Sequence, residues 1–135
     1  MQVWLLYSFL ALLAWGVWGF LPKVALAHVP PQSVLVWQGF GAAVCTLVFF
    51  AFTRQVQTES IGIMAGLGTG FFAFLGSLFF IFALSTGKTS VVIMLTALYP
   101  LVSIFLAIVF LGETLTWQNF LGIGFGMLAL YFLVH

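Results

Sequence analysis

Polar residues divide this chain into five long apolar runs, at about residues 3–21, 32–52, 61–84, 89–111 and 115–134. The first run continues more weakly to Ala27. A helix needs about 20 apolar residues to cross the roughly 30 Å hydrocarbon core of a bilayer. The runs are continuous and lack the alternating pattern of membrane strands. The pattern therefore predicts an all-α, polytopic membrane protein with five transmembrane helices in one domain, residues 1–135.

Charged and turn-forming residues stand between the runs. Lys23 and the Pro30–Pro31 pair separate the first two, Arg54 follows the second, Lys88 precedes the fourth and Glu113 follows it. Because the connections are short, consecutive helices are expected to be antiparallel neighbours. An odd number of spans then puts the two termini on opposite sides of the membrane.

Composition strengthens the membrane assignment. Hydrophobic residues make up 64% of the chain, charged residues 4%, and the mean hydropathy is +1.31, whereas soluble domains carry about 25% charged residues. There is no basic stripe for nucleic acid, and Cys45 stands alone, which excludes an intrachain disulfide. We find no catalytic constellation and no metal-ligand cluster, so we expect neither an enzyme nor a cofactor.

The few basic residues give little information about orientation. Arg54 is predicted on the N-terminal side of the membrane, and Lys23 and Lys88 on the opposite side. Counted by the positive-inside rule, the bias is small. Two interpretations stay open: a weakly fixed orientation with the Lys23 and Lys88 side in the cytoplasm, or dual topology, in which copies insert both ways.

Polar and aromatic side chains inside the apolar runs are the candidates for a substrate cavity, because polar groups in hydrocarbon need a partner or water. They are Trp15, Trp18, Gln38, Ser77, Thr96, Tyr99 and Ser103. Pro100 removes a backbone hydrogen bond near the middle of the fourth helix and frees a carbonyl near Thr96. The alternative is a kinked helix whose hydroxyls bond to its own carbonyls.

Small residues form a stripe on the third helix at Gly62, Gly66 and Gly70, and another on the fifth at Gly122 and Gly126. In lipid, helices associate where small residues let backbones approach closely. The stripes therefore predict helix-packing faces, and the stripe on the third helix could also border a cavity.

Several of these features occur together in a known family. From residue 83 onward the chain has a small-residue start to the fourth helix, then Pro100, the Leu111–Gly112–Glu113 turn and a glycine-bearing last helix. The N-terminal part adds Trp15–Gly16, Lys23 and Pro30–Pro31. In this order and spacing, the whole chain resembles a single EamA domain, the repeat unit of the drug/metabolite transporter superfamily.

The resemblance implies a function and an assembly. Members usually contain two five-helix units in inverted orientation and export or exchange small organic metabolites or drugs. A single unit implies an antiparallel homodimer, or a pair with a similar chain, in lipid contact in the plasma membrane of a bacterium or archaeon. Alternating access would proceed around a midplane cavity. The alternatives are half of a longer transporter and a non-transporting assembly or lipid-binding subunit.

Two departures from related patterns bear on the substrate. Many EamA units carry Arg early in the second helix, where this chain has Gln38. The first helix also lacks the membrane Glu of small multidrug-resistance proteins. The first departure removes a charge that is often available to anionic substrates, and the second argues against proton-coupled cation export by that mechanism. Glu59 and Glu113 both lie outside the apolar runs, so we expect a small apolar or amphipathic solute.

Overall fold

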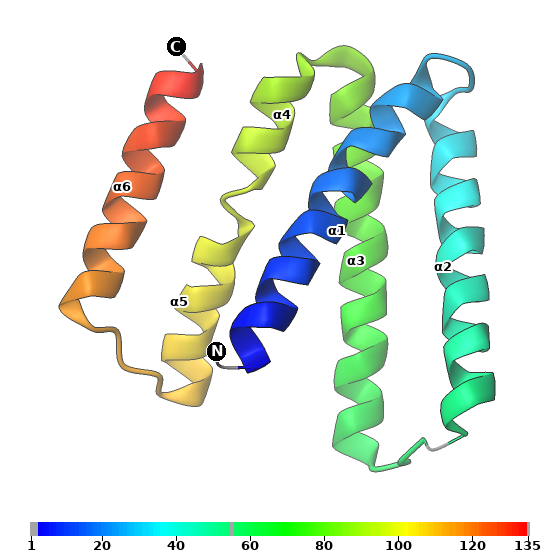
Figure 1. Ribbon diagram of the computed structural model, residues 1–135, viewed down its shortest axis with the longest axis horizontal. Coiled ribbons are helices and arrows are strands. Elements are labelled where there is room, and N and C mark those ends of the chain that lie inside the picture. Colours follow the sequence, from blue (N-terminus) through cyan, green and yellow to red (C-terminus); the bar gives the residue numbers. More distant parts are fainter. Residues whose placement is uncertain (1–2, 55, 135) are drawn as a thin grey trace. The chain divides into compact units, whose positions relative to one another are not determined.

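The computed structural model describes residues 3–54 and 56–134, except for the side chains of residues 130, 133 and 134. Helices make up the regular structure of this part of the chain (Figure 1). They are α1 (Val3–Leu26), α2 (Pro31–Thr53), α3 (Ser60–Thr86), α4 (Thr89–Thr96), α5 (Tyr99–Leu111) and α6 (Trp117–Val134). In that part, α1, α2, α3 and the segment Thr89–Leu111 are long and apolar enough to cross a membrane. The all-α, polytopic prediction is confirmed, while a fifth span at α6, with 18 residues, stays a prediction.

Contacts divide the chain into two compact units, α1–α3 and α4–α6. In the first unit, α1 packs against α2 and α3, and α2 packs against α3. The consecutive helices run in opposite directions, as their short connections predict (Figure 1). Whether both units act as one domain stays a prediction.

The boundaries of α1 and α2 follow from their prolines. α1 continues through Pro22 to Leu26, which agrees with the weak continuation of the first span beyond residue 21 that the sequence indicates. Pro22 lacks an N–H group, but it is buried, and the packing of this turn against α3 holds the helix together. Proline is favoured in the first turn of a helix, where its missing N–H would be unpaired anyway, and α2 begins at Pro31.

The core of the first unit lies toward one end of its helices. The buried residues there are Gly19, Pro22, Val34, Ser77, Phe80, Ile81 and Leu84. Large side chains nearer the other end, such as Phe9, Phe50 and Met64, are exposed. The three helices are therefore tied together near the α1–α2 connection and expose apolar faces over the rest of their length.

The fourth apolar run forms two helices in place of one continuous helix. α4 ends at Thr96, and α5 begins at Tyr99 with Pro100 in its first turn. Pro100 has no N–H to offer the Thr96 carbonyl four residues earlier, and its ring clashes with that carbonyl. The backbone between them tightens, with the Leu98 N–H bonded to the Leu95 oxygen at 3.3 Å.

The second unit is completed by a sharp turn and a return helix. Gly112 ends α5 in the left-handed region, at φ 67°, which glycine adopts without a Cβ penalty. The Thr116 hydroxyl then accepts a 3.4 Å hydrogen bond from the Asn119 N–H and so caps the start of α6. α6 returns to contact α4.

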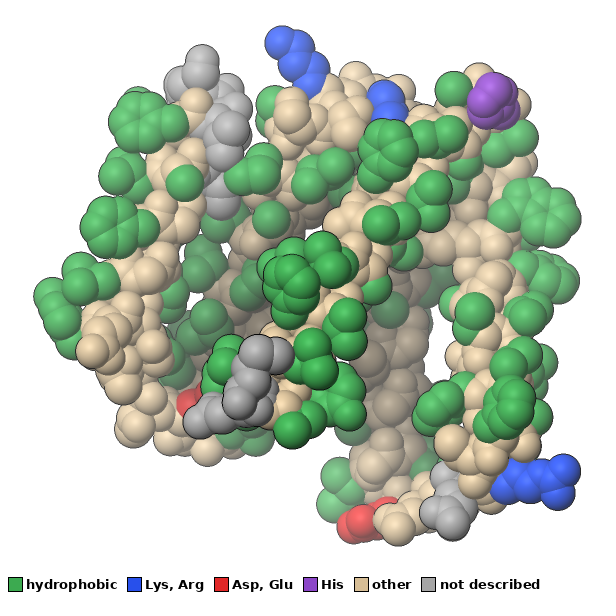
Figure 2. All heavy atoms as spheres, in the orientation of Figure 1, with side chains coloured by type: hydrophobic (Ala, Val, Ile, Leu, Met, Phe, Trp, Pro, Cys, Tyr) green, Lys and Arg blue, Asp and Glu red, His purple; other side chains and the backbone are tan. Residues whose placement is uncertain are grey.

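Charged side chains lie at helix ends, and hydrophobic side chains cover the helix lengths on the face that Figure 2 shows. Arg54 follows α2, and Lys88 and Glu113 lie in connections between helices. This distribution agrees with helices whose apolar sides face hydrocarbon and whose ends reach polar surroundings.

Replacing Pro100 by alanine is expected to straighten the break between α4 and α5, because the new N–H can donate to the Thr96 carbonyl. Spin labels at Ser90→Cys and Ile108→Cys, in a Cys45→Ala background, would report the change as a distance measured by double electron–electron resonance. A straight helix separates these two Cα atoms by about 27 Å, at about 1.5 Å per residue. The distance should move toward that value in Pro100→Ala and stay unchanged in Leu101→Ala. An unchanged distance in both variants would show that Pro100 does not cause the break.

Candidate functional site

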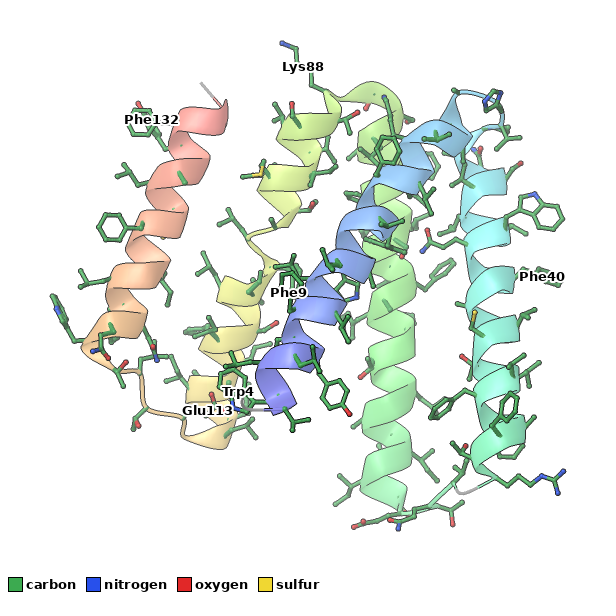
Figure 3. All side chains as sticks on the ribbon, viewed as in Figure 1. Trp4, Phe9, Phe40, Lys88, Glu113 and Phe132 are labelled. Carbon is green, nitrogen blue, oxygen red and sulfur yellow. The ribbon has the colours of Figure 1, made fainter. Side chains whose placement is uncertain are left out.

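Gln38 and Ser77 join α2 to α3 by a polar contact inside the first unit. The Gln38 Nε2 donates a 2.8 Å hydrogen bond to the Ser77 Oγ, and Ser77 is only 8% exposed. Phe40, two residues further along α2, points away from α3 (Figure 3). Gln38 is therefore on the inner side of α2, where the sequence predicts a cavity residue.

One atom of this pair lacks a partner. The Gln38 Oε1 is buried, and no hydrogen-bond partner for it lies in the described part of the chain. A buried acceptor without a partner costs about 1–3 kcal/mol. The oxygen is thus suited to accept a hydrogen bond from an N–H or O–H group that is not part of this chain. Because the amide is neutral, it would select such a group by hydrogen bonding, without a fixed charge.

Trp18 joins α1 to the same face of α3. Its ring stacks on Phe80, with the centroids 5.4 Å apart and the planes at 14°. Ser77, Phe80 and Leu84 recur at helical spacing and are all buried, so α1 and α2 both pack on one stripe of α3. Trp18 is still 41% exposed, and the second predicted tryptophan, Trp15, is 62% exposed on α1.

The remaining predicted cavity residues lie in the second unit, around the break between α4 and α5. The Thr96 Oγ1 donates to the Val92 and Ile93 carbonyl oxygens at 2.8 and 3.0 Å. The Ser103 Oγ donates to the Tyr99 carbonyl oxygen at 3.5 Å. These bonds within the helices match the alternative in which the hydroxyls satisfy their own backbone.

The structure thus brings Gln38 and Ser77 into direct contact. Trp18 stacks on Phe80, which lies three residues after Ser77 on the same buried stripe of α3. Tyr99 and Ser103 are connected to each other. A single cavity that includes all seven predicted residues stays a prediction.

The predicted glycine contact faces are not covered by the packing within either unit. At Gly62, Gly66, Gly70, Gly122 and Gly126, the place that a Cβ atom would take has no neighbouring atom within 4 Å. Their role in helix packing stays a prediction.

Lys23 has a role that the sequence did not reveal. The sequence favours an interfacial anchor, and the structure adds that the Lys23 Nζ donates a 2.8 Å hydrogen bond to the Leu84 oxygen. Leu84 lies in the last turn of α3, where carbonyl groups lack partners within the helix and attract cations. The spacing of Ser77, Phe80 and Leu84 was the available signal for this contact face.

Comparison with known proteins decides the family. A model of the EamA-like transporter family matches residues 2–135. The chain belongs to this family. It is therefore a multi-pass membrane protein of a transporter family, as the sequence resemblance predicts, and that assignment supports transport over catalysis.

One curated relative of this EamA protein has a similar length. It is the uncharacterized protein MJ1333.1 of Methanocaldococcus jannaschii, which is 26% identical over 123 residues, with 91% of this chain and 90% of the relative aligned. No solved structure gives a significant match.

A double-mutant cycle is expected to detect the hydrogen bond between Gln38 and Ser77. Ser77→Ala should lower the free energy of unfolding in the native background and have little effect in the Gln38→Leu background. Interhelical hydrogen bonds in membrane proteins average about 0.6 kcal/mol and reach about 1.7 kcal/mol, and the coupling energy should fall in that range. Unfolding in mixed micelles measures it.

The control for this cycle is Ser8→Ala. The Ser8 hydroxyl donates to the Trp4 carbonyl oxygen within α1, so its effect should add to that of Gln38→Leu without coupling. Equal coupling energies in the two cycles would contradict a specific contact between Gln38 and Ser77.

Proposed function

We propose that two copies of this EamA protein associate in antiparallel orientation and together form a ten-helix transporter. It would export or exchange a small organic metabolite or drug-like solute by alternating access. The observation that carries this proposal is that the three helices of the first unit pack together at one end only. The glycine face of α3, at Gly62, Gly66 and Gly70, is not covered within that unit, on a helix that is long and apolar enough to cross a membrane.

A second copy is a suitable occupant for these open faces. In lipid, apolar area alone gives little drive for association, so contacts depend on close backbone approach at small residues. Glycines on α3 and α6 allow that approach. The alternative occupant is a similar but distinct chain, which would complete a heterodimer by the same contacts.

The balance of basic residues supports the antiparallel arrangement. With Arg54 on one predicted side and Lys23 and Lys88 on the other, positive charge gives little preference between the two orientations. The relative from Methanocaldococcus jannaschii is aligned over 90% of its own length, so the similarity covers nearly all of that protein.

The proposed cavity combines aromatic surfaces with neutral hydrogen-bonding groups. Trp15, Trp18 and Tyr99 would offer apolar contact, and Gln38, Ser77, Thr96 and Ser103 would offer hydrogen bonds. The unpartnered Gln38 Oε1 is an acceptor for a donor group on the solute. An uncharged or amphipathic compound with an N–H or O–H group suits this set of side chains.

The break between α4 and α5 would supply the moving part. Inverted repeats alternate access by rocking against each other around a fixed site. The helical ladder is interrupted at Leu98, whose N–H bonds to the Leu95 oxygen three residues back, and at Pro100, which cannot donate to Thr96. We propose that α4 and α5 change their mutual angle at this point when the site opens to one side.

Dual topology is expected to appear as labelling from both sides of the membrane. A Gln57→Cys variant in a Cys45→Ala background places one thiol in the connection between α2 and α3. An impermeant maleimide should label about half of the molecules from each side, since copies that insert both ways are populated about equally when the charge bias is small. Labelling from one side only would contradict the antiparallel homodimer. A matched thiol at Ser90→Cys, beyond α3, should give the same division.

Reconstituted protein is expected to move solutes across vesicles, and Trp18→Ala is expected to slow this flux. A stacked aromatic pair contributes about 0.5–1.5 kcal/mol beyond its buried area, and the upper value corresponds to about a tenfold change. A panel of amino acids, nucleosides and lipophilic compounds would be tested for uptake and exchange.

Trp37→Ala is the matched control for this flux measurement, because Trp37 is 69% exposed on α2 and pairs with Phe40, which points away from α3 (Figure 3). Its flux should stay near that of the unmodified protein. A folded dimer that moves no member of the panel would contradict transport and favour a non-transporting subunit.

A further inference from the structure

A hollow of about 470 Å³ lies where three helix ends meet in the first unit. α1 ends there, α2 begins there, and α3 ends beside them. Its walls include Lys23, His28, Ser85 and the Pro30–Pro31 pair. The sequence places this end of the helices at a membrane surface, away from the proposed midplane cavity, so the hollow is a separate feature.

The hollow carries basic groups and has no acidic residue among the described residues that line it. The Lys23 ammonium has three N–H donors and gives one of them to the Leu84 oxygen. That bond fixes the position of the ammonium and leaves two donors for another acceptor. His28 is exposed in the turn after α1, where its backbone N–H is bonded to the Ala25 oxygen at 2.9 Å.

Carbonyl groups at the ends of α1 and α3 would repel an anion if they were unpaired, but several have partners. The Ala25 oxygen accepts hydrogen bonds from the His28 and Val29 N–H groups at 2.9 and 3.0 Å. The Phe82 oxygen accepts one from the Ser85 hydroxyl at 2.7 Å. These hydrogen bonds occupy part of the acceptor capacity at the two helix ends, and the Lys23 ammonium adds a full positive charge beside the N-terminal end of α2.

The rest of the lining is apolar. Leu26, Ala27 and Val29 stand beside the two prolines, and exposed apolar side chains such as Leu21 and Val24 continue along α1 toward the membrane interior. A ligand for this place therefore needs an anionic head and gains from an attached hydrocarbon part. A free inorganic anion would use the head site alone.

We propose that this hollow binds the phosphate group of an anionic phospholipid at the membrane surface, with Lys23 and His28 as the basic contacts. Basic pockets between membrane helices bind lipid head groups through such contacts, and each Lys or Arg near the surface contributes about 1 kcal/mol. The acyl chains would lie along the exposed side of α1. This proposal does not rest on the identity of the solute or on the dimer arrangement.

The test measures binding of phosphatidylglycerol and phosphatidylcholine to the purified full chain in mild detergent, by native mass spectrometry. The anionic lipid should be retained in preference to the zwitterionic one. Lys23→Gln should weaken phosphatidylglycerol binding by about fivefold, which is the ratio that about 1 kcal/mol represents. Lys88→Gln removes the same charge from a lysine that does not line the hollow, and it should change the affinity little.

Two further variants separate lipid binding from the hydrogen bond that Lys23 donates to the Leu84 oxygen at the end of α3. Lys23→Arg keeps the charge and should restore most of the affinity. His28→Gln leaves the bond between Lys23 and Leu84 intact and should still weaken phosphatidylglycerol binding. Equal losses in Lys23→Gln and Lys88→Gln would overturn the proposal, because they would show attraction to general surface charge.

Inorganic phosphate distinguishes the two sources of the anion. It should displace phosphatidylglycerol only at concentrations far above that of the lipid, since it lacks the hydrocarbon contacts. Displacement by equimolar phosphate would overturn the lipid assignment and identify a site for a soluble anion. Equal retention of both lipids by the unmodified chain would overturn the proposal altogether.

Discussion

Hydrocarbon offers no hydrogen-bond partners, and the rest of this structure depends on that constraint. Helices satisfy their own backbone, so the chain becomes a set of apolar helices joined by short connections. The polar groups within them then bond either to the same helix, as the Thr96 hydroxyl does, or to a neighbour, as Gln38 does with Ser77. Bonds of the second kind help to hold neighbouring helices together, and in the first unit they lie near the same end as the buried core.

The constraint explains what could be read from the sequence. Membrane helices are visible as long apolar runs, and the break after Thr96 follows from the missing N–H of Pro100. The partners of individual side chains were not readable, because the rotation of one helix against another leaves no mark in hydrophobic periodicity when every face is apolar. Gln38 was a cavity candidate and Lys23 an interfacial anchor from sequence, but Ser77 and the Leu84 carbonyl emerged as their partners only in three dimensions. The extension of α1 past Pro22 was only weakly indicated for a related reason: packing on α3 compensates for a local loss that sequence rules treat as a stop.

α3 connects these observations, because its two ends have different partners. Toward Leu84 it contacts α1 through Phe80 and Lys23, and α2 through Ser77. Toward Gly62 its small residues are not covered within the first unit. A helix fixed at one end and uncovered at the other can rest against a second surface without breaking its existing contacts. This asymmetry leaves the glycine-bearing half of α3 available for the proposed contact with a second chain.

The proposed inversion of the second copy gives the hollow around Lys23 a consequence for the pair. In an antiparallel dimer one copy of the hollow would face each leaflet, so an anionic lipid bound on either side would hold the fixed end of one chain at its own membrane surface. The break between α4 and α5 lies in the other unit and carries no such charge contact. Rocking would then involve helices without surface anchors, while the anchored ends of both α3 helices keep the polar pairs of Gln38 and Ser77 at a constant depth. The lipid site would thus act on transport by positioning the helices, without contacting the solute.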